Sequence, residues 1–477
     1  MSIEEYNHLF IKNKTKALEN LLELIDKAKN LDKEYNIFET IIDNPYVGKN
    51  TSLISGTPYT LKDNFSTKGI LTTASSNSLK DYVPVFDATV YKKLNDAGCV
   101  MIGKTTMDEL ALGGTGTTGH LGPVKNAYNK ELISGGSSSG SAVSVALDLV
   151  PFSIGSDTGD SVRKPAAYNG VVGFKPSYGL VSRYGLFPFA TSLDTVGVLS
   201  KTVLDAAMVT NEIKGKDEKD MTSYDSSDID LVENIKVEPT SKKLFYIKEL
   251  VDMSNFEDVT DNNYIQDIIM KYSEVVSDLK NKGYTVEGIS IDKELLKAIY
   301  PAYLVISCSE ATSNDSNLTG IIFGPKSEGK TSIDKMKNFR GENFCSLIKR
   351  RFVIGSYSLE KENQEKYFLN AKRIRRMLVD ILDKTFSEYD ALILPVGNGY
   401  IPKIGEKYSI KDEMESALDN HLILGNFGGY PSITLPASIV NNFPFAINIT
   451  SQRYEDKKLL NLAYDIEKIL KEGEKDV

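Results

Sequence analysis

Hydrophobic positions along the first half of the chain recur with two different spacings. Leucines at helical spacing predict an amphipathic helix over residues 15–35. Short apolar runs bounded by turn residues predict buried strands, at 54–60, 100–102, 150–154 and 171–174. Helical patterns at 90–97 and 140–147 alternate with these strands. Alternating strands and helices indicate an α/β fold.

The second half of the chain repeats this alternation. Strands are predicted at 244–247, 391–395, 432–436 and 445–449. A basic helix is predicted at 363–384, and a closing helix begins near Lys457.

Two polar segments interrupt the pattern and are interpreted as surface loops, over residues 214–243 and 324–343. Residues 1–50 are expected to form an N-terminal helical segment. No internal repeat is visible, and 477 residues fit one large domain, so we expect a single domain over residues 1–477.

Composition and charge narrow the classes of protein. Hydrophobic residues at 41% and charged residues at 25% are typical of a globular protein. A net charge of −9 argues against nucleic-acid binding by the chain as a whole. The three cysteines are widely separated, which favours reduced thiols over disulfides or a zinc site, so no metal is expected. There is no signal-peptide pattern and no apolar run of ~18–20 residues, so we expect a cytoplasmic protein without membrane contact.

One motif match does not fit the structure it would require. Residues 98–105 satisfy G-x-x-x-x-G-K-[ST], but a phosphate-binding loop needs a strand before it and a helix after it. Here a helical pattern precedes Gly98, and the residues between the glycines are apolar. We interpret the segment as a helix–glycine–strand connection. The glycines at 114, 116 and 119 are an equally weak match to a dinucleotide-binding motif.

Candidate nucleophile chemistry lies in two serine-containing segments and one lysine. Ser137 lies in a Gly-Gly-Ser-Ser-Ser-Gly-Ser run, and Ser161 follows Asp-Thr-Gly-Asp. A serine needs a base, and the chain has only three histidines, so a lysine is favoured. Lys62, at the end of a predicted buried strand, would need its pKa lowered from ~10.4 toward ~7–8. The alternatives are an exposed loop lysine and a flexible Ser-Gly linker. Consecutive N–H groups at residues 158–161 would suit an oxyanion hole.

Together these segments resemble the amidase signature family. The resemblance rests on Lys62, the Gly-Gly-Ser-Ser run, the Gly-Ser-Asp-Thr-Gly-x-Ser-x-Arg-x-Pro segment from Gly155, and residues 170–176. It covers roughly residues 50–470, and it implies an α/β amidase signature fold with a central mixed β-sheet covered by helices on both faces. Within the family, residues 104–109 and 173–185 look like those of the A subunits of glutamyl-tRNA(Gln) amidotransferases.

The resemblance implies a role for each residue of the site. Ser161 would be the nucleophile that forms a γ-glutamyl ester. Ser137, reached through a cis peptide bond, would pass the proton of Ser161 to neutral Lys62, and Ser138 would support it. The oxyanion would be held by N–H groups at Thr158, Gly159, Asp160 and Ser161.

Arg351 and Asp419 are the residues implied to hold the substrate. Arg351 would bind the α-carboxylate of glutamine and Asp419 its α-ammonium, because opposite charges hold these groups best. Arg350 competes with Arg351 for this role, and either charge could instead lie on the surface. The three histidines, His8, His120 and His421, have no evident catalytic role.

The chain departs from the family pattern beside the nucleophile. Asp160 and Ser139 stand where the family usually has glycine, and Lys164 stands where relatives usually have an uncharged residue. We expect the Asp160 carboxylate to point away from the oxyanion hole and to face Lys164 or Arg163. Residues 113–120 also lack an acidic residue that is often present in relatives.

The resemblance implies a glutaminase subunit of a tRNA-dependent amidotransferase. Ammonia from glutamine would pass to the B subunit of the complex, which would amidate glutamyl-tRNA(Gln), with aspartyl-tRNA(Asn) as a second candidate substrate. The B subunit would bind ATP and Mg and make most of the tRNA contacts, and a small C subunit would complete the complex. This chain would need no cofactor. The alternatives are a stand-alone amidase for small molecules and a catalytically silent scaffold.

Overall fold

A single mixed sheet of eleven strands runs through the protein, in the order β1–β3–β2–β4–β6–β5–β10–β11–β9–β7–β8. The computed structural model describes residues 1–48, 52–256, 262–407, 409–410 and 412–473. The strands are β1 (Phe38–Ile41), β2 (Pro58–Lys62), β3 (Val100–Thr105), β4 (Phe152–Asp157), β5 (Val172–Lys175), β6 (Thr195–Ser200), β7 (Lys243–Ile247), β8 (Thr285–Ile289), β9 (Ala391–Pro395), β10 (Ser432–Val440) and β11 (Phe443–Ser451). Parallel and antiparallel neighbours both occur, so the predicted mixed sheet is confirmed.

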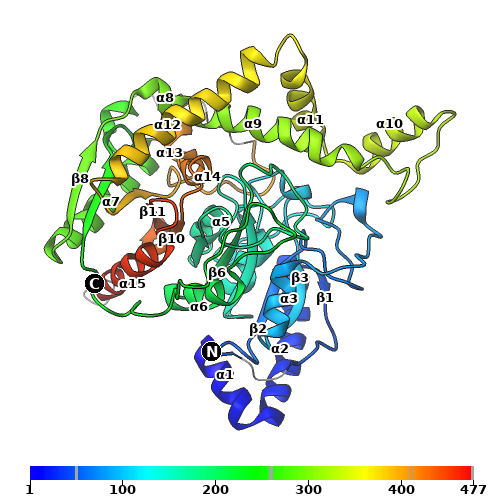
Figure 1. Cartoon of the computed structure of the whole chain (residues 1–477), viewed down its shortest axis with the longest axis horizontal. Helices are drawn as coiled ribbons and strands as arrows, with labels where there is room; N and C mark the ends of the chain where they lie inside the picture. The colour runs from blue at the N-terminus through cyan, green and yellow to red at the C-terminus, as the bar shows by residue number, and fades with distance from the viewer. Residues whose placement is uncertain (49–51, 257–261, 408, 411, 474–477) are drawn as a thin grey trace.

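Fifteen α-helices are present in the described ranges, and they surround the sheet in Figure 1. They are α1 (Ile3–Lys12), α2 (Lys14–Tyr35), α3 (Thr89–Asp96), α4 (Ser139–Ala146), α5 (Arg163–Tyr168), α6 (Val203–Ile213), α7 (Asn262–Asn281), α8 (Lys293–Lys297), α9 (Ile299–Asn314), α10 (Ser332–Asn343), α11 (Ser346–Leu359), α12 (Asn370–Phe386), α13 (Glu413–Asn420), α14 (Ile423–Phe427) and α15 (Asp456–Gly473). Within the described ranges, no helix combines the length and apolarity needed to span a membrane.

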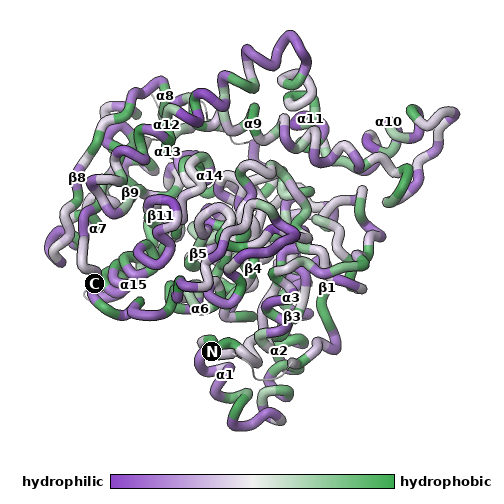
Figure 2. Tube along the Cα trace, in the orientation of Figure 1, coloured by the Kyte–Doolittle hydropathy of each residue, from purple (hydrophilic) through white to green (hydrophobic). Residues whose placement is uncertain are grey.

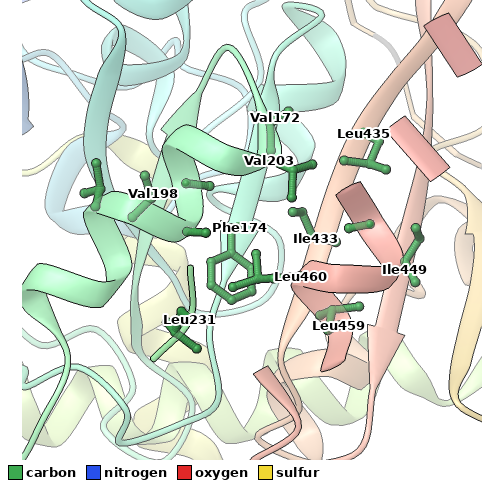
Figure 3. Packing of buried hydrophobic residues seen from close by; sticks show 14 of the residues in the cluster. Val172, Phe174, Val198, Val203, Leu231, Ile433, Leu435, Ile449, Leu459 and Leu460 are labelled. Carbon is green, nitrogen blue, oxygen red and sulfur yellow. The ribbon is translucent and has the colours of Figure 1, made fainter. Parts of the chain in front are cut away.

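Helices cover both faces of the sheet because successive strand residues point to opposite sides. On one face, Phe174 of β5 and Ile433 of β10 pack with Leu460 of α15 (Figure 3). On the other face, Phe245 of β7 and Leu392 of β9 lie in a cluster with α9, α12 and α14. Figure 2 shows hydrophilic and hydrophobic residues alternating along the outer helices, as expected for helices with one face toward the core.

Several predicted elements need correction. The predicted strand at 54–60 begins only at Pro58, and β1, β6 and β8 were not predicted. The segment 324–343 is not a loop throughout, because α10 occupies residues 332–343. A capping box between Thr331 and Asp334 starts this helix, a polar signal independent of hydrophobic periodicity. In Figure 1, α10 lies at the outer edge of the molecule, whereas the following helix α11 packs against α9.

Residues 214–243, all of which the structure describes, contain no helix and only the first residue of β7. Leu231 and Ile235 nevertheless bury their side chains in the main core, and Figure 3 shows Leu231 beside the sheet. This segment is therefore an irregular covering of the core.

The segment 98–105 is a helix–glycine–strand connection, as predicted. Gly98 has a φ of 80° and joins α3 to β3. Lys104, the lysine of the motif match, is buried within β3, where its Nζ lies 3.3 Å from Asp63 Oδ1 and donates to the carbonyl of Phe65. Lys104 therefore forms a buried ion pair with Asp63 that serves a structural role.

Candidate active site

Lys62 is the last residue of β2 and is fully buried. Its Nζ donates to Ser137 Oγ at 2.8 Å, and to Oγ and the carbonyl of Ser156 at 2.9 and 3.2 Å. Ser156 lies in β4, the parallel neighbour of β2, so the carboxyl ends of both strands reach the same edge of the sheet. The structure thus places Lys62 and Ser137 together, as the sequence predicted.

Burial is the main influence on the charge of Lys62. It lowers the pKa of this lysine from 10.5 to about 7, against the opposing effect of nearby carboxylates, first of all Asp108. A substantial fraction of the amine is therefore neutral near pH 7, which is the form that can accept a proton.

Ser137 lies in a turn that is fixed by an aspartate which the sequence analysis missed. The peptide bond between Gly136 and Ser137 is cis, as the resemblance implied. Asp108, which is buried, accepts hydrogen bonds from the N–H groups of residues 115–118, and its own N–H donates to the Ser137 carbonyl at 3.3 Å. A Cβ at Gly136 would lie 2.0 Å from Asp108 Oδ2, so this turn requires glycine. Asp108 falls within the family-like segment 104–109, which is the only sequence signal that pointed to it.

Ser161 lies in the turn between β4 and α5 and is 3% exposed. Its carbonyl accepts from the N–H of Ser138 at 3.1 Å, which ties the two serine segments together. In the described part of the chain, Ser161 Oγ makes no hydrogen bond to another protein group. Of the two hydrogen bonds that the serine relay needs, the described residues therefore form the one between Lys62 and Ser137 and not the one between Ser137 and Ser161.

Backbone donors accompany Ser161 in this turn. Among the described residues, the N–H groups of Gly159, Asp160 and Ser161 donate to no other protein group. Three adjacent free donors are the construction that an oxyanion hole needs. At the start of this turn, the side chain of Thr158 donates to Asp194 at 2.6 Å and leaves its own N–H unaffected.

Arg163 holds the same turn in place through an ion pair and several hydrogen bonds. Its guanidinium is fully buried and pairs with Asp157 at 2.9 Å, while Asp157 also accepts from the N–H of Val162. The guanidinium donates further to the carbonyl of Gly159 and to Asn426 in α14. This network connects β4, α5 and α14, so segments distant in sequence hold the loop around Ser161.

A cavity of about 580 Å³ opens beside this turn and contains the predicted substrate-binding residues. Arg351 and Asp419 both line it, together with Asp160, Lys164 and Tyr303. Arg350 is exposed and does not line the cavity, so the structure favours Arg351 over its neighbour.

The guanidinium of Arg351 is available in this cavity. Its centre lies 5.6 Å from the ring centre of Phe189. Within the described ranges, its Nε and Nη1 atoms are buried and donate to no acceptor. A buried cation with unsatisfied donors is well suited to bind a carboxylate.

Asp160 faces Lys164, one of the two partners that the sequence analysis named, because Arg163 is engaged by Asp157. Burial raises the pKa of Asp160 to about 6, partly offset by Lys164. Lys164 Nζ lies 3.9 Å from Asp160 Oδ2 and only 2.7 Å from Asp419 Oδ2. The predicted ammonium-binding carboxylate is therefore already paired with a lysine of the protein.

These observations define a buried lysine–serine pair beside backbone N–H donors and a polar cavity, and the comparisons give the family in which this arrangement occurs. The family model described as Amidase matches residues 19–460, and the chain therefore belongs to the amidase family. Within that family it is similar to the A subunit of the glutamyl-tRNA(Gln) amidotransferase of Mycoplasma genitalium, with 41% identity over 424 residues and 87% of each chain covered.

Solved structures agree with this assignment. The crystal structure of the A subunit of the glutamyl-tRNA(Gln) amidotransferase of Thermotoga maritima superimposes with a TM-score of 0.80 at 34% identity, covering 98% of this chain and 94% of that one. A crystal structure of an amidase gives a TM-score of 0.76 at 26% identity, covering 98% and 99%. The amidase fold expected from the sequence is therefore confirmed.

Proposed function

We propose that this protein is the glutaminase subunit of a tRNA-dependent amidotransferase. The observation that carries the proposal is the hydrogen bond between buried Lys62, with its pKa near 7, and Ser137. The neighbouring Ser161 turn borders, through Asp160, a cavity lined by Arg351, two of whose guanidinium donors are unsatisfied. The similarity to A subunits over most of the chain supports the same assignment.

The chemistry begins when neutral Lys62 accepts the Ser137 proton while Ser137 accepts the proton of Ser161. The Ser161 oxygen then attacks the side-chain amide carbon of glutamine. The resulting oxyanion is held by the N–H groups that no protein group uses. When the C–N bond breaks, the proton on Lys62 returns through Ser137 to the leaving nitrogen, which departs as ammonia. Water, deprotonated by the same relay, cleaves the γ-glutamyl ester and restores Ser161.

For this relay to work, the side chains of Ser137 and Ser161 must rotate until their hydroxyl groups form a hydrogen bond. Ser161 Oγ makes no hydrogen bond within the described part of the protein, so it is free to turn toward Ser137. Ser138 keeps the two segments in register through its N–H bond to the Ser161 carbonyl and through its Oγ at 3.2 Å from the Ser156 carbonyl.

Glutamine would be held across the cavity by its two charged α-groups. Arg351 would bind the carboxylate with donors that are otherwise unsatisfied, and Asp419 would bind the ammonium. Opposite charges in a partly buried cavity orient the side-chain amide toward Ser161.

The ammonia would be consumed by the partner proteins of the complex. The B subunit would bind ATP and Mg and amidate glutamyl-tRNA(Gln), and also aspartyl-tRNA(Asn) if the complex serves both. The C subunit would complete a cytoplasmic heterotrimer. The net charge of −9 fits a chain that leaves tRNA contact mainly to its partner.

Ammonia release from glutamine tests the proposal. The complex co-purified with its partner proteins is compared with its Ser161→Ala form. We expect activity in the first and loss of at least ~10³-fold in the second, because the nucleophile is removed. Equal residual activity in both would indicate a silent scaffold. Activity on other small amides, without glutamine turnover and without the partner proteins, would indicate a stand-alone amidase.

A further inference from the structure

One lysine is shared by two carboxylates on the wall of the cavity. Lys164 Nζ is 2.7 Å from Asp419 Oδ2 and 3.9 Å from Asp160 Oδ2. The side chains of Lys164, Asp419 and Asp160 are only 10%, 11% and 17% exposed, so water screens these charges weakly. With both carboxylates ionised, the trio carries one net negative charge and has one cation too few for one-to-one pairing.

We propose that Lys164 is a movable partner of the two carboxylates, and that it leaves Asp419 for Asp160 when the ammonium group of an α-amino acid binds to Asp419. The inference rests on the proposed function, because it takes Asp419 as the ammonium-binding group. The substrate supplies the missing second cation. Each carboxylate then has one cation, and no buried charge is left unpaired.

The geometry permits this exchange with little movement. Asp160 and Lys164 are one helical turn apart, joined by a hydrogen bond of 2.8 Å from the N–H of Lys164 to the carbonyl of Asp160. Residues four apart on a helical turn face each other, and the lysine stem is long and flexible. At 3.9 Å from Asp160 Oδ2, the amine is already within ion-pair distance of this carboxylate, so a small rotation of the side chain exchanges its closer partner.

Asp160 and Lys164 therefore act as a compensating pair that determines specificity. Without Asp160, Lys164 has no second partner, and a substrate ammonium must share Asp419 with it. Without Lys164, two carboxylates face each other in a buried site. With both present, a substrate that carries an ammonium is preferred over one that lacks it.

The test compares glutamine with glutaramate, which is glutamine without its α-amino group. Ammonia release gives kcat and KM for the wild-type complex, Asp160→Asn, Lys164→Met and the double variant. We expect Asp160→Asn to raise the ratio of the KM for glutamine to the KM for glutaramate about tenfold, which is the loss of one charge-assisted interaction with the substrate ammonium; the ratio cancels any general effect of a change beside the nucleophile. Adding Lys164→Met should restore the KM for glutamine, because Asp419 is then free of its lysine partner and can bind the substrate ammonium alone.

Controls separate this inference from its alternatives. Glu238→Gln removes a carboxylate from another i,i+4 pair with a lysine, remote from the cavity, and should change neither KM. Thermal unfolding checks each variant, and Asp160→Ser replaces Asp160→Asn if the latter does not fold. Equal KM changes for both substrates, or a double variant no better than Asp160→Asn, would overturn the exchange and leave the glutaminase proposal intact. A wild-type complex that cleaves glutaramate but not glutamine would overturn both.

Discussion

The pKa of Lys62 determines how the proposed reaction responds to pH. Burial lowers it from 10.5 to about 7. An unperturbed lysine would be neutral in roughly one molecule in 3,000 at pH 7, whereas about half of the Lys62 side chains are neutral there. Protonation of Lys62 is therefore about 5 kcal/mol less favourable in the folded protein than in the unfolded chain, at 1.36 kcal/mol per pKa unit.

We therefore expect kcat/KM for glutamine to be constant above about pH 8 and to fall about tenfold per unit below pH 7. The assay is ammonia release by the complex between about pH 5.5 and 9. Asp160, with a pKa of about 6, titrates in the same range, so the profile is repeated with Asp160→Asn and with glutaramate. Lys62→Arg, whose guanidinium stays protonated, should have no activity at any of these pH values.

Stability should respond to the same ionisation. Between pH 7 and 10.5 the unfolded chain holds a proton on Lys62 that the folded protein has released, so the free energy of unfolding gains a contribution that rises with pH in this window. A profile for glutaramate in Asp160→Asn that stays flat down to about pH 5.5 would refute the reasoning, because Lys62 would then not be the titrating base.

Three further outcomes are expected. Gly136→Ala should lower activity at least ~100-fold, because its Cβ would lie 2.0 Å from Asp108 Oδ2 and displace the serine turn, whereas Gly341→Ala, with no atom within 4 Å, should retain activity. Arg163→Met should lower the free energy of unfolding in urea by about 3–5 kcal/mol, because its carboxylate partner stays buried and unpaired; a loss below about 1 kcal/mol would contradict this. Burial lowers the pKa of His421 to about 4, so the wild type should lose about 3 kcal/mol more stability than His421→Asn between pH 6.5 and 4, and parallel pH curves would contradict it.

Much of the site was predictable because its chemistry is local in sequence. Glycines around Ser137 and Ser161 mark turns that present a hydroxyl and backbone donors, and these glycines and serines are visible in the sequence even though distant residues hold the turns in place. Lys62 could be placed because it ends a buried strand. The roles of these residues in catalysis remain predictions, which the ammonia assays test.

Other features could not be predicted, because they depend on packing. Asp108 is one polar residue among many in the sequence, and only the fold brings it under the serine turn. Arg350 and Arg351 are adjacent and chemically equal, and the orientation of α11 decides which one lines the cavity.

The sequence by itself determined the α/β class and the serine and lysine segments, because strand periodicity and turn residues act over a few positions. The spacing of Asp160 and Lys164 already allowed their pairing to be expected, whereas only the tertiary structure decided that Lys164 also pairs with Asp419. Asp160 and Lys164 come from the β4–α5 region and Asp419 from α13, and the Lys164–Asp419 contact joins residues 255 positions apart. The interaction energies of these groups depend on distances and burial, and such distances exist only once the sheet has brought the segments together.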